Sequence, residues 1–161
     1  MAGGLEQPWR DSMLTQLILA TAMVLSTVLV HLIGLAILMR LLRSHTRTWG
    51  KHAIMPLTLL LAATIGIIAI HTVEIWLFAL LYLQLGAFSH FEQALYFSTV
   101  TYATIGYGDL VMPHQWRIVG AIEGAAGIIM LGWSTAFLVS LLTQLKLLGH
   151  DWLATESKYS D

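Results

Sequence analysis

The chain has 161 residues, of which 57% are hydrophobic and 11% are charged, and its mean hydropathy is +0.75. This balance lies far outside the range of soluble domains and indicates a membrane protein. The formal net charge of −1 excludes the strongly basic surface typical of nucleic-acid binding, and the absence of cysteine excludes disulfides and thiolate metal sites.

Three apolar segments are long enough to cross a hydrocarbon layer of about 30 Å, which needs about 20 helical residues. They cover about residues 13–42, 53–88 and 118–148. The second segment is longer than a perpendicular span, so we expect one tilted helix, with Pro56 or Gly66 as the place for any bend. The first apolar run exceeds the core of a signal peptide, so we expect it to stay in the mature protein.

Basic residues predict the orientation of these helices. The connection between the first two apolar segments holds half of the lysines and arginines of the chain, and the next connection holds only Arg117. Short loops rich in basic residues stay on the cytoplasmic side. We therefore expect the N-terminus outside and the C-terminus in the cytoplasm. The four basic residues of the first connection are Arg40, Arg43, Arg47 and Lys51.

A short helical pattern and a glycine-rich loop lie between the second and third segments. The pattern starts near Ser89, a candidate helix cap with Glu92 three residues later, and is too short to span the membrane. We predict a re-entrant half-helix, which membranes tolerate only where protein or water covers the following loop. In that loop Gly106 and Gly108 let successive carbonyls point toward one axis, and a ring of carbonyls can coordinate a cation.

The loop TIGYGD, residues 104–109, resembles the selectivity-filter signature of the potassium-channel pore family. The resemblance covers about residues 67–146 and implies a two-helix pore domain of the small bacterial type, here with an extra N-terminal transmembrane helix. It also implies a location in the bacterial inner membrane. It implies that four loops replace the hydration shell of K⁺ with carbonyl oxygens, and that the Thr104 hydroxyl completes the innermost site. The ion-binding residues that it implies are Thr104, Ile105, Gly106, Tyr107 and Gly108.

The resemblance also implies a support for the filter, and here the chain departs from its relatives. Tyr107 and Asp109 would point back and hold the filter in shape, and Tyr96 and Phe97 stand where many relatives carry aromatic residues behind the filter. Where some relatives carry a glutamate bonded to the filter aspartate, this chain has Val100. The hydrogen bonds that support the filter in these relatives are therefore not assumed for this chain. No helix repeats arginine at every third position, so we expect no voltage sensor.

The third apolar segment supplies a candidate hinge and a candidate cavity lining. By the resemblance, the hinge glycine of the inner helix falls at about Gly127. Helical spacing places four further residues on one stripe, which we assign to the cavity and the lower gate. An alternative is that the glycines serve only for close packing and that the threonine of the stripe bonds its own backbone. The stripe consists of Ile128, Leu131, Thr135 and Val139.

Four ionisable residues lie inside the apolar segments, namely His31, His71, Glu74 and Glu123. Such groups are costly in a membrane and are functional candidates by default. One hypothesis is a cluster that senses pH or binds a metal and tunes gating, because histidine titrates near neutral pH. The other is that these groups bond one another and hold the first helix and the filter in place.

The sequence thus predicts an all-α membrane protein with three transmembrane helices, a re-entrant pore helix and a filter loop, assembled as a homotetramer in the lipid bilayer. We expect passive, K⁺-selective conduction without catalysis, nucleic acid or any cofactor beyond the permeant K⁺. Alternatives are a weakly selective cation channel and a metal- or haem-binding membrane protein that uses the histidines and glutamates. The expected parts are a peripheral segment at 1–52, a pore domain at 53–148 and a tail at 149–161.

Overall fold

The computed structural model describes residues 8–48 and 55–144, and within them the chain is all-helical. This confirms the predicted fold class. The tail at 149–161 and Lys51 of the basic connection lie outside the described residues. The elements are α1 (Pro8–Thr48), α2 (Met55–Gln84), α3 (Phe91–Tyr102), the short 3₁₀ helix η1 (His114–Trp116) and α4 (Arg117–Gln144).

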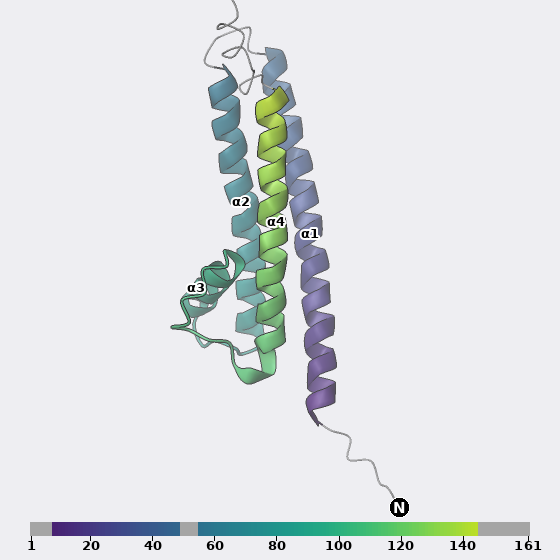
Figure 1. Cartoon of the computed structure of the whole chain (residues 1–161), viewed down its shortest axis with the longest axis vertical. Helices are drawn as coiled ribbons and strands as arrows, with labels where there is room; N and C mark the ends of the chain where they lie inside the picture. The colour runs from purple at the N-terminus through teal and green to yellow at the C-terminus, as the bar shows by residue number, and fades with distance from the viewer. Residues whose placement is uncertain (1–7, 49–54, 145–161) are drawn as a thin grey trace, which may run out of the picture.

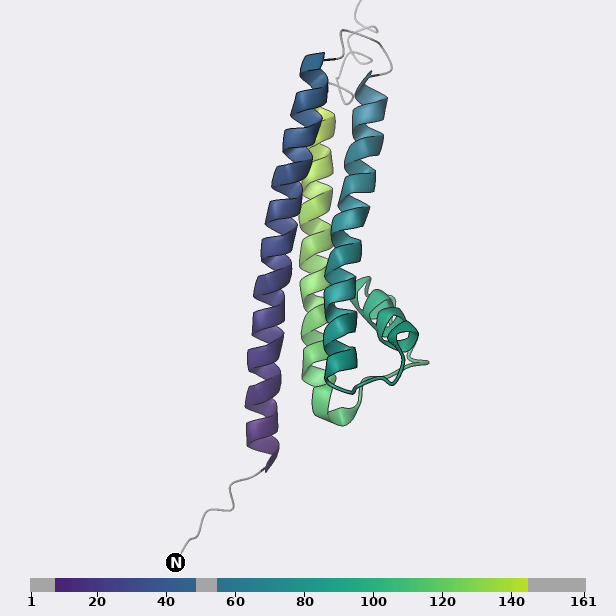
Figure 2. The ribbon, with the colours of Figure 1, turned by 180° about the vertical axis from the view of Figure 1, so that it is seen from behind.

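Three of these helices are long and apolar enough to cross a membrane. The qualifying stretches are Met13–Ser44, Leu57–Gln84 and His114–Gln144, which confirms the three predicted spans. The helices run alongside one another as a bundle (Figures 1 and 2). Their burial inside the single chain is low, so most of their surface is available to lipid or to other subunits.

Helix α2 is one continuous helix, as predicted, but it ends earlier than the apolar run does. It includes Pro56 in its first turn and stops at Gln84, four residues before the predicted limit at Phe88. The cause is Gly86, whose φ of +64° suits the left-handed position that follows a helix. Its amide donates to the Leu83 carbonyl at 3.1 Å, and the next amide donates to the Tyr82 carbonyl at 3.0 Å.

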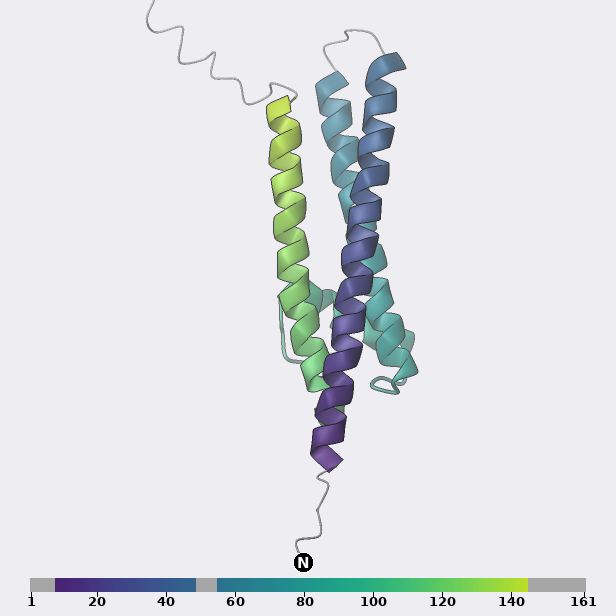
Figure 3. The same ribbon diagram turned by 90° about the vertical axis from the view of Figure 1, so that its right-hand side faces the viewer.

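Helix α3 is the predicted half-helix, and it packs against α2 and α4 away from the C-terminal end of α1 (Figures 1 and 3). The predicted cap at Ser89 is wrong. The helix begins at Phe91, and its N-cap is His90, which makes no side-chain capping bond. The residues before it are held by burial, because Phe88 is part of the aromatic core and fixes where the chain can turn into the helix.

Two apolar clusters hold the bundle together. One joins α2, α3 and α4 around Tyr82 and Phe97, whose rings meet edge to face with centroids 5.5 Å apart. The other joins α1 to α2 around Leu38 and Ala63. The end where α1 stops and α2 begins lies away from the half of the bundle that carries α3 (Figure 2). The C-terminal end of α1, with Arg40 and Arg43, and the glycine-rich loop therefore lie toward opposite ends of the bundle.

Candidate functional site

The loop after α3 has an unusual backbone. Thr104, Gly106 and Gly108 have φ angles of +57°, +58° and +77°, whereas Ile105 and Tyr107 between them do not have positive φ. Glycine adopts these angles freely, but a β-branched residue such as Thr104 does so only at a cost that the surrounding structure must offset. An alternation of left- and right-handed residues turns successive carbonyls toward the same side of the chain.

The amides at the start of this loop are tied to the end of α3. Thr104 donates to the Thr101 carbonyl at 3.0 Å, and Ile105 and Gly106 both donate to the Val100 carbonyl, at 2.8 and 3.2 Å. These bonds satisfy carbonyls that the end of a helix leaves unpaired. Within the described part of the chain, no carbonyl of residues 104–108 accepts a hydrogen bond. The loop therefore has free acceptors and no spare donors in its first half, which suits a cation.

The Asp109 side chain ties the far end of the loop to α3. The Tyr96 hydroxyl donates to its carboxylate at 2.7 Å. This bond raises the pKa of the Tyr96 phenol above its ordinary value of 10.0, because the neutral phenol is the donor. Phe97, the other predicted support, instead faces the core, where it stacks on Phe88 with ring centroids 5.2 Å apart.

Glycines of α4 lie directly against α3. A Cβ atom at Gly127 would overlap the carbonyl group of Tyr102, and one at Gly124 would come within 3.4 Å of the Thr101 carbonyl oxygen. One at Gly120 would come within 3.3 Å of the Phe97 ring. The structure thus gives Gly127 a packing role, as the alternative interpretation held, and α4 continues through it as one helix. A hinge at this glycine stays a prediction.

The predicted cavity stripe lies on a face of α4 that its own chain leaves open. All four of its residues are exposed. The hydroxyl of the threonine donates to the Leu131 carbonyl at 2.9 Å, so it bonds its own helix backbone. This face is available to a central cavity or to a neighbouring chain. Its residues are Ile128, Leu131, Thr135 and Val139.

Three of the four intramembrane ionisable residues meet in one place, which we call the His–Glu cluster: His31 of α1 with His71 and Glu74 of α2. His31 Nδ1 lies 2.9 Å from Glu74 Oε1, and His71 Nδ1 lies 3.0 Å from Glu74 Oε2. All three side chains are buried. The predicted shared face of His71 and Glu74 is therefore confirmed, and α1 completes the cluster.

Two residues that the sequence did not single out extend this cluster to α3 and α4. The Tyr102 hydroxyl donates to Glu74 and lies 2.9 Å from His71 Nδ1. Ser134 Oγ lies 2.9 Å from His71 Nε2 and 3.4 Å from His31 Nε2. Tyr102 is the last residue of α3, and the loop begins two residues later. The cluster therefore connects all four helices directly behind the loop.

Glu123 forms a separate site. Its carboxylate accepts hydrogen bonds from Tyr82 of α2 and Ser98 of α3, each at 2.5 Å. All three side chains are fully buried. The four ionisable residues thus make two sites rather than one, and both fasten α3 to the long helices.

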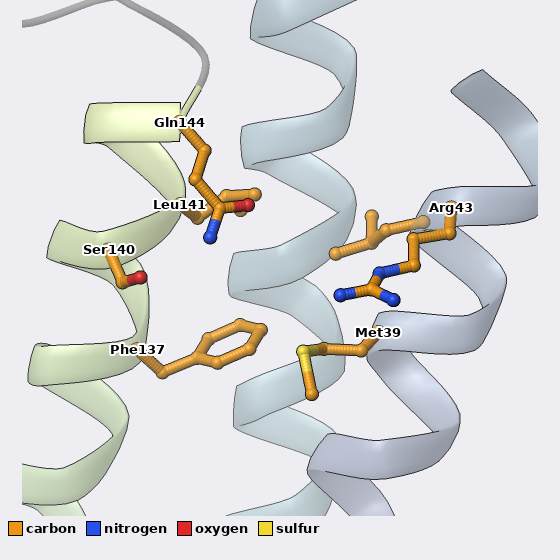
Figure 4. A pocket seen from close by; sticks show the side chains of 7 residues that line it. Met39, Arg43, Phe137, Ser140, Leu141 and Gln144 are labelled. Carbon is orange, nitrogen blue, oxygen red and sulfur yellow. The ribbon is translucent and has the colours of Figure 1, made fainter.

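Helix α1 packs against α4 near the start of α1 and again near its end. Near its start, the Gln16 side-chain oxygen accepts a hydrogen bond from the Ile118 amide at 3.0 Å. Near its end, Met39 and Arg43 line a pocket together with Phe137 and other residues of α4 (Figure 4). The extra helix is therefore part of the same bundle as the pore helix and its loop.

A half-helix between two spanning helices, followed by a loop of free carbonyls, defines the pore domain of a membrane protein. Residues 54–144, more than half of the chain, match a family model described as an ion channel. The chain belongs to this ion channel family and is a multi-pass membrane protein. No curated protein and no solved structure shows significant similarity to it.

Proposed function

We propose that the protein is a potassium-selective channel that conducts K⁺ passively through a filter built from residues 104–108 of four identical chains. The observation that carries this proposal is the backbone of the loop, with its alternating φ angles, tied amides and free carbonyls. Four such loops around one axis offer K⁺ a shell of oxygens in place of its hydration water. The K⁺ ligands are the carbonyls of Thr104, Ile105, Gly106 and Tyr107 and the Thr104 hydroxyl.

The exposure of the loop supports a homotetramer. In the single chain Tyr107 is 70% exposed and Ile105 is 49% exposed, although both belong to an apolar protein. A closed ring of carbonyls needs several copies of the loop, and a fourfold axis supplies four. The open stripe of α4 then lines the cavity below the filter, where the negative end of the α3 dipole favours a cation.

The charge pattern supports an orientation in which the filter opens outward. Arg40 and Arg43 lie at the end of the bundle opposite to α3, and basic residues favour the cytoplasmic side. In this orientation the N-terminus is outside and the C-terminus is in the cytoplasm of a bacterial cell. The pore domain is 53–148, and α1 is a peripheral addition to it.

A weakly selective cation channel is the second candidate, and the filter support favours it. Within the described part of the chain, the Asp109 carboxylate has one hydrogen-bond donor, the Tyr96 hydroxyl. Fewer supporting bonds allow the ring of carbonyls to adjust to Na⁺. A haem protein is not proposed, because the imidazole rings of His31 and His71 lie 5.4 Å apart between packed helices, which leaves no room for a macrocycle.

The proposal is tested by measuring the mass of the purified protein in detergent and its K⁺ efflux from lipid vesicles. We expect a fourfold assembly, K⁺ efflux without equal Na⁺ efflux, and loss of the efflux in Gly106→Ala, because alanine is strained at a φ of +58°. Gly132→Ala is the matched control, since nothing lies within 4 Å of a Cβ there. A monomeric protein, or equal efflux from Gly106→Ala, would overturn the proposal.

A further inference from the structure

The His–Glu cluster has no part in the conduction proposed above, yet it is the most polar site inside the bundle. Ligand atoms of His31, His71 and Glu74 all lie within 4.8 Å of one another. They come from two helices and meet against Tyr102 of α3 and Ser134 of α4. The chain contains no cysteine, so thiolate ligands are excluded and imidazole and carboxylate are the ligands it offers for a zinc-type ion.

The first feature of this site is that both imidazoles aim the same nitrogen at one carboxylate. The two Nδ1 atoms lie 2.9 and 3.0 Å from the oxygens of Glu74. In a tetrahedral zinc site with bonds of about 2.0–2.1 Å, neighbouring ligand atoms are about 3.3 Å apart. The two distances between imidazole and carboxylate are therefore only a few tenths of an ångström shorter than in such a site, and the Tyr102 hydroxyl lies near enough to His71 for the fourth position.

The second feature is the arrangement of the outer nitrogens. Both Nε2 atoms face Ser134 Oγ, at 2.9 and 3.4 Å. When Nδ1 binds a metal, Nε2 carries the hydrogen, and one hydroxyl oxygen can accept two such donors. Without a metal, two neutral imidazoles that donate from Nδ1 to Glu74 present two acceptors at Nε2. The single hydrogen of Ser134 satisfies only one of them.

The third feature is charge. Glu74 is fully buried, and its ion-pair partners within the described part of the chain are the two imidazoles. A divalent cation held between these three side chains would supply the positive charge that a buried carboxylate needs.

We propose that His31, His71 and Glu74 bind one divalent transition-metal ion per chain, with Zn²⁺ as the ion that suits this ligand set best. The ion joins the extra helix α1 to α2. Through Tyr102 it also fixes the end of α3, two residues before the loop. The site is then a structural clamp behind the filter, and its existence does not depend on which ion the filter conducts.

The test is direct metal analysis of the tag-free protein. The protein is incubated with Zn²⁺, passed over a desalting column and analysed by mass spectrometry for metal per chain, and Co²⁺ is used in parallel for its tetrahedral absorption bands. We expect about one ion per chain in the unsubstituted protein and loss of the ion in His31→Gln and His71→Gln. His90→Gln is the matched control, because His90 is exposed outside the cluster and its loss leaves the ion in place.

A second variant decides the matter if the ligand variants do not fold. Ser134→Ala keeps all three ligands and removes the acceptor of both outer N–H groups, so we expect it to keep the tetramer and bind Zn²⁺ about 10–100-fold more weakly. The proposal is overturned if the unsubstituted protein holds no ion, if His31→Gln holds as much as the unsubstituted protein, or if Ser134→Ala binds with unchanged affinity. None of these results bears on K⁺ conduction, which the vesicle assay measures separately.

Discussion

The Tyr96 hydroxyl donates a hydrogen bond of 2.7 Å to the Asp109 carboxylate and so joins α3 to the far end of the loop at residues 104–109. Both residues are exposed in the single chain. The other end of the loop is held by three backbone amides that bond to α3. The loop is therefore fixed at both ends to the same short helix.

Tyr96→Phe removes this bond and keeps the ring. We expect the variant to conduct with reduced preference for K⁺ over Na⁺, because the outer half of the proposed filter loses the hydrogen bond that ties it to α3. Asp109→Asn retains an acceptor for the Tyr96 hydroxyl and should have the smaller effect. Reversal potentials in mixed K⁺ and Na⁺ measure both variants, and an unchanged preference in Tyr96→Phe would show that the bond does not support the filter.

The pH dependence of this pair follows from the raised pKa of Tyr96. A raised pKa means that the bond is present below the ordinary value of 10.0 and is lost only as the pH rises through the raised value. The difference in selectivity between Tyr96→Phe and the unsubstituted protein should therefore be constant from pH 7 to pH 9. A difference that disappears within this range would contradict the assignment of the phenol as the donor.

Glu123 should matter for assembly rather than for conduction. Glu123→Leu leaves the buried hydroxyl of Tyr82 without its acceptor, which costs about 1–3 kcal/mol, whereas Ser98 can still donate to the Ile75 carbonyl at 2.9 Å. Glu123→Gln keeps a hydrogen-bond acceptor at this position and should lose less stability than Glu123→Leu. Thermal unfolding in detergent, followed by circular dichroism, compares the two variants. Equal stability of Glu123→Leu and the unsubstituted protein would contradict this role.

Two glycines of α4 provide a matched pair. In Gly127→Ala the new methyl group overlaps the carbonyl of Tyr102, so α3 must shift and the protein should be destabilised by about 1–3 kcal/mol. In Gly132→Ala the methyl group meets no atom of its own chain, and alanine favours the helix by about 0.5–1 kcal/mol. Unfolding of the two variants measures the difference. Comparable stability of both would mean that Gly127 has no special packing role.

The bond from Gln16 to the Ile118 amide predicts a local effect. Gln16→Met keeps the size of the side chain but removes the acceptor, so the first turn of α4 loses a partner for one of its unpaired amides. We expect hydrogen exchange at Ile118 to become faster by about tenfold, which corresponds to about 1.4 kcal/mol, while exchange in the middle of α4 is unchanged. Leu14→Met, at an exposed position of the same helix, is the control.

The sequence predicted the three spanning helices and the half-helix because each depends on a local property. Runs of apolar residues show the spans, and the short amphipathic pattern shows α3. Helix ends were less predictable. The apolar run continues past Gln84, and only the left-handed glycine at position 86 marks the end of α2. The Ser89 cap failed because the burial of Phe88, a tertiary contact, decides where α3 begins.

For the polar sites, too, the sequence predicted what local spacing decides and missed what packing between helices decides. The spacing of His71 and Glu74 already indicates that they share a helix face. The contribution of His31 depends on how α1 packs, and residues 31 and 74 are far apart in the sequence. Ser134 gave no signal, because a single serine or threonine hydroxyl in an apolar helix usually bonds its own backbone, as Thr135 does. Tyr102 gave none because its partners lie on α2, where packing places them. The separation of Glu123 from the His–Glu cluster likewise depends on packing.

The most direct test of the central claim is the reversal potential of the purified protein in a planar bilayer with K⁺ on one side and Na⁺ on the other. The account predicts a potential that follows the K⁺ gradient when K⁺ is varied and does not change when Na⁺ is varied. A reversal potential near zero under these conditions would contradict a K⁺-selective filter at residues 104–108 and would leave a pore that does not distinguish the two ions.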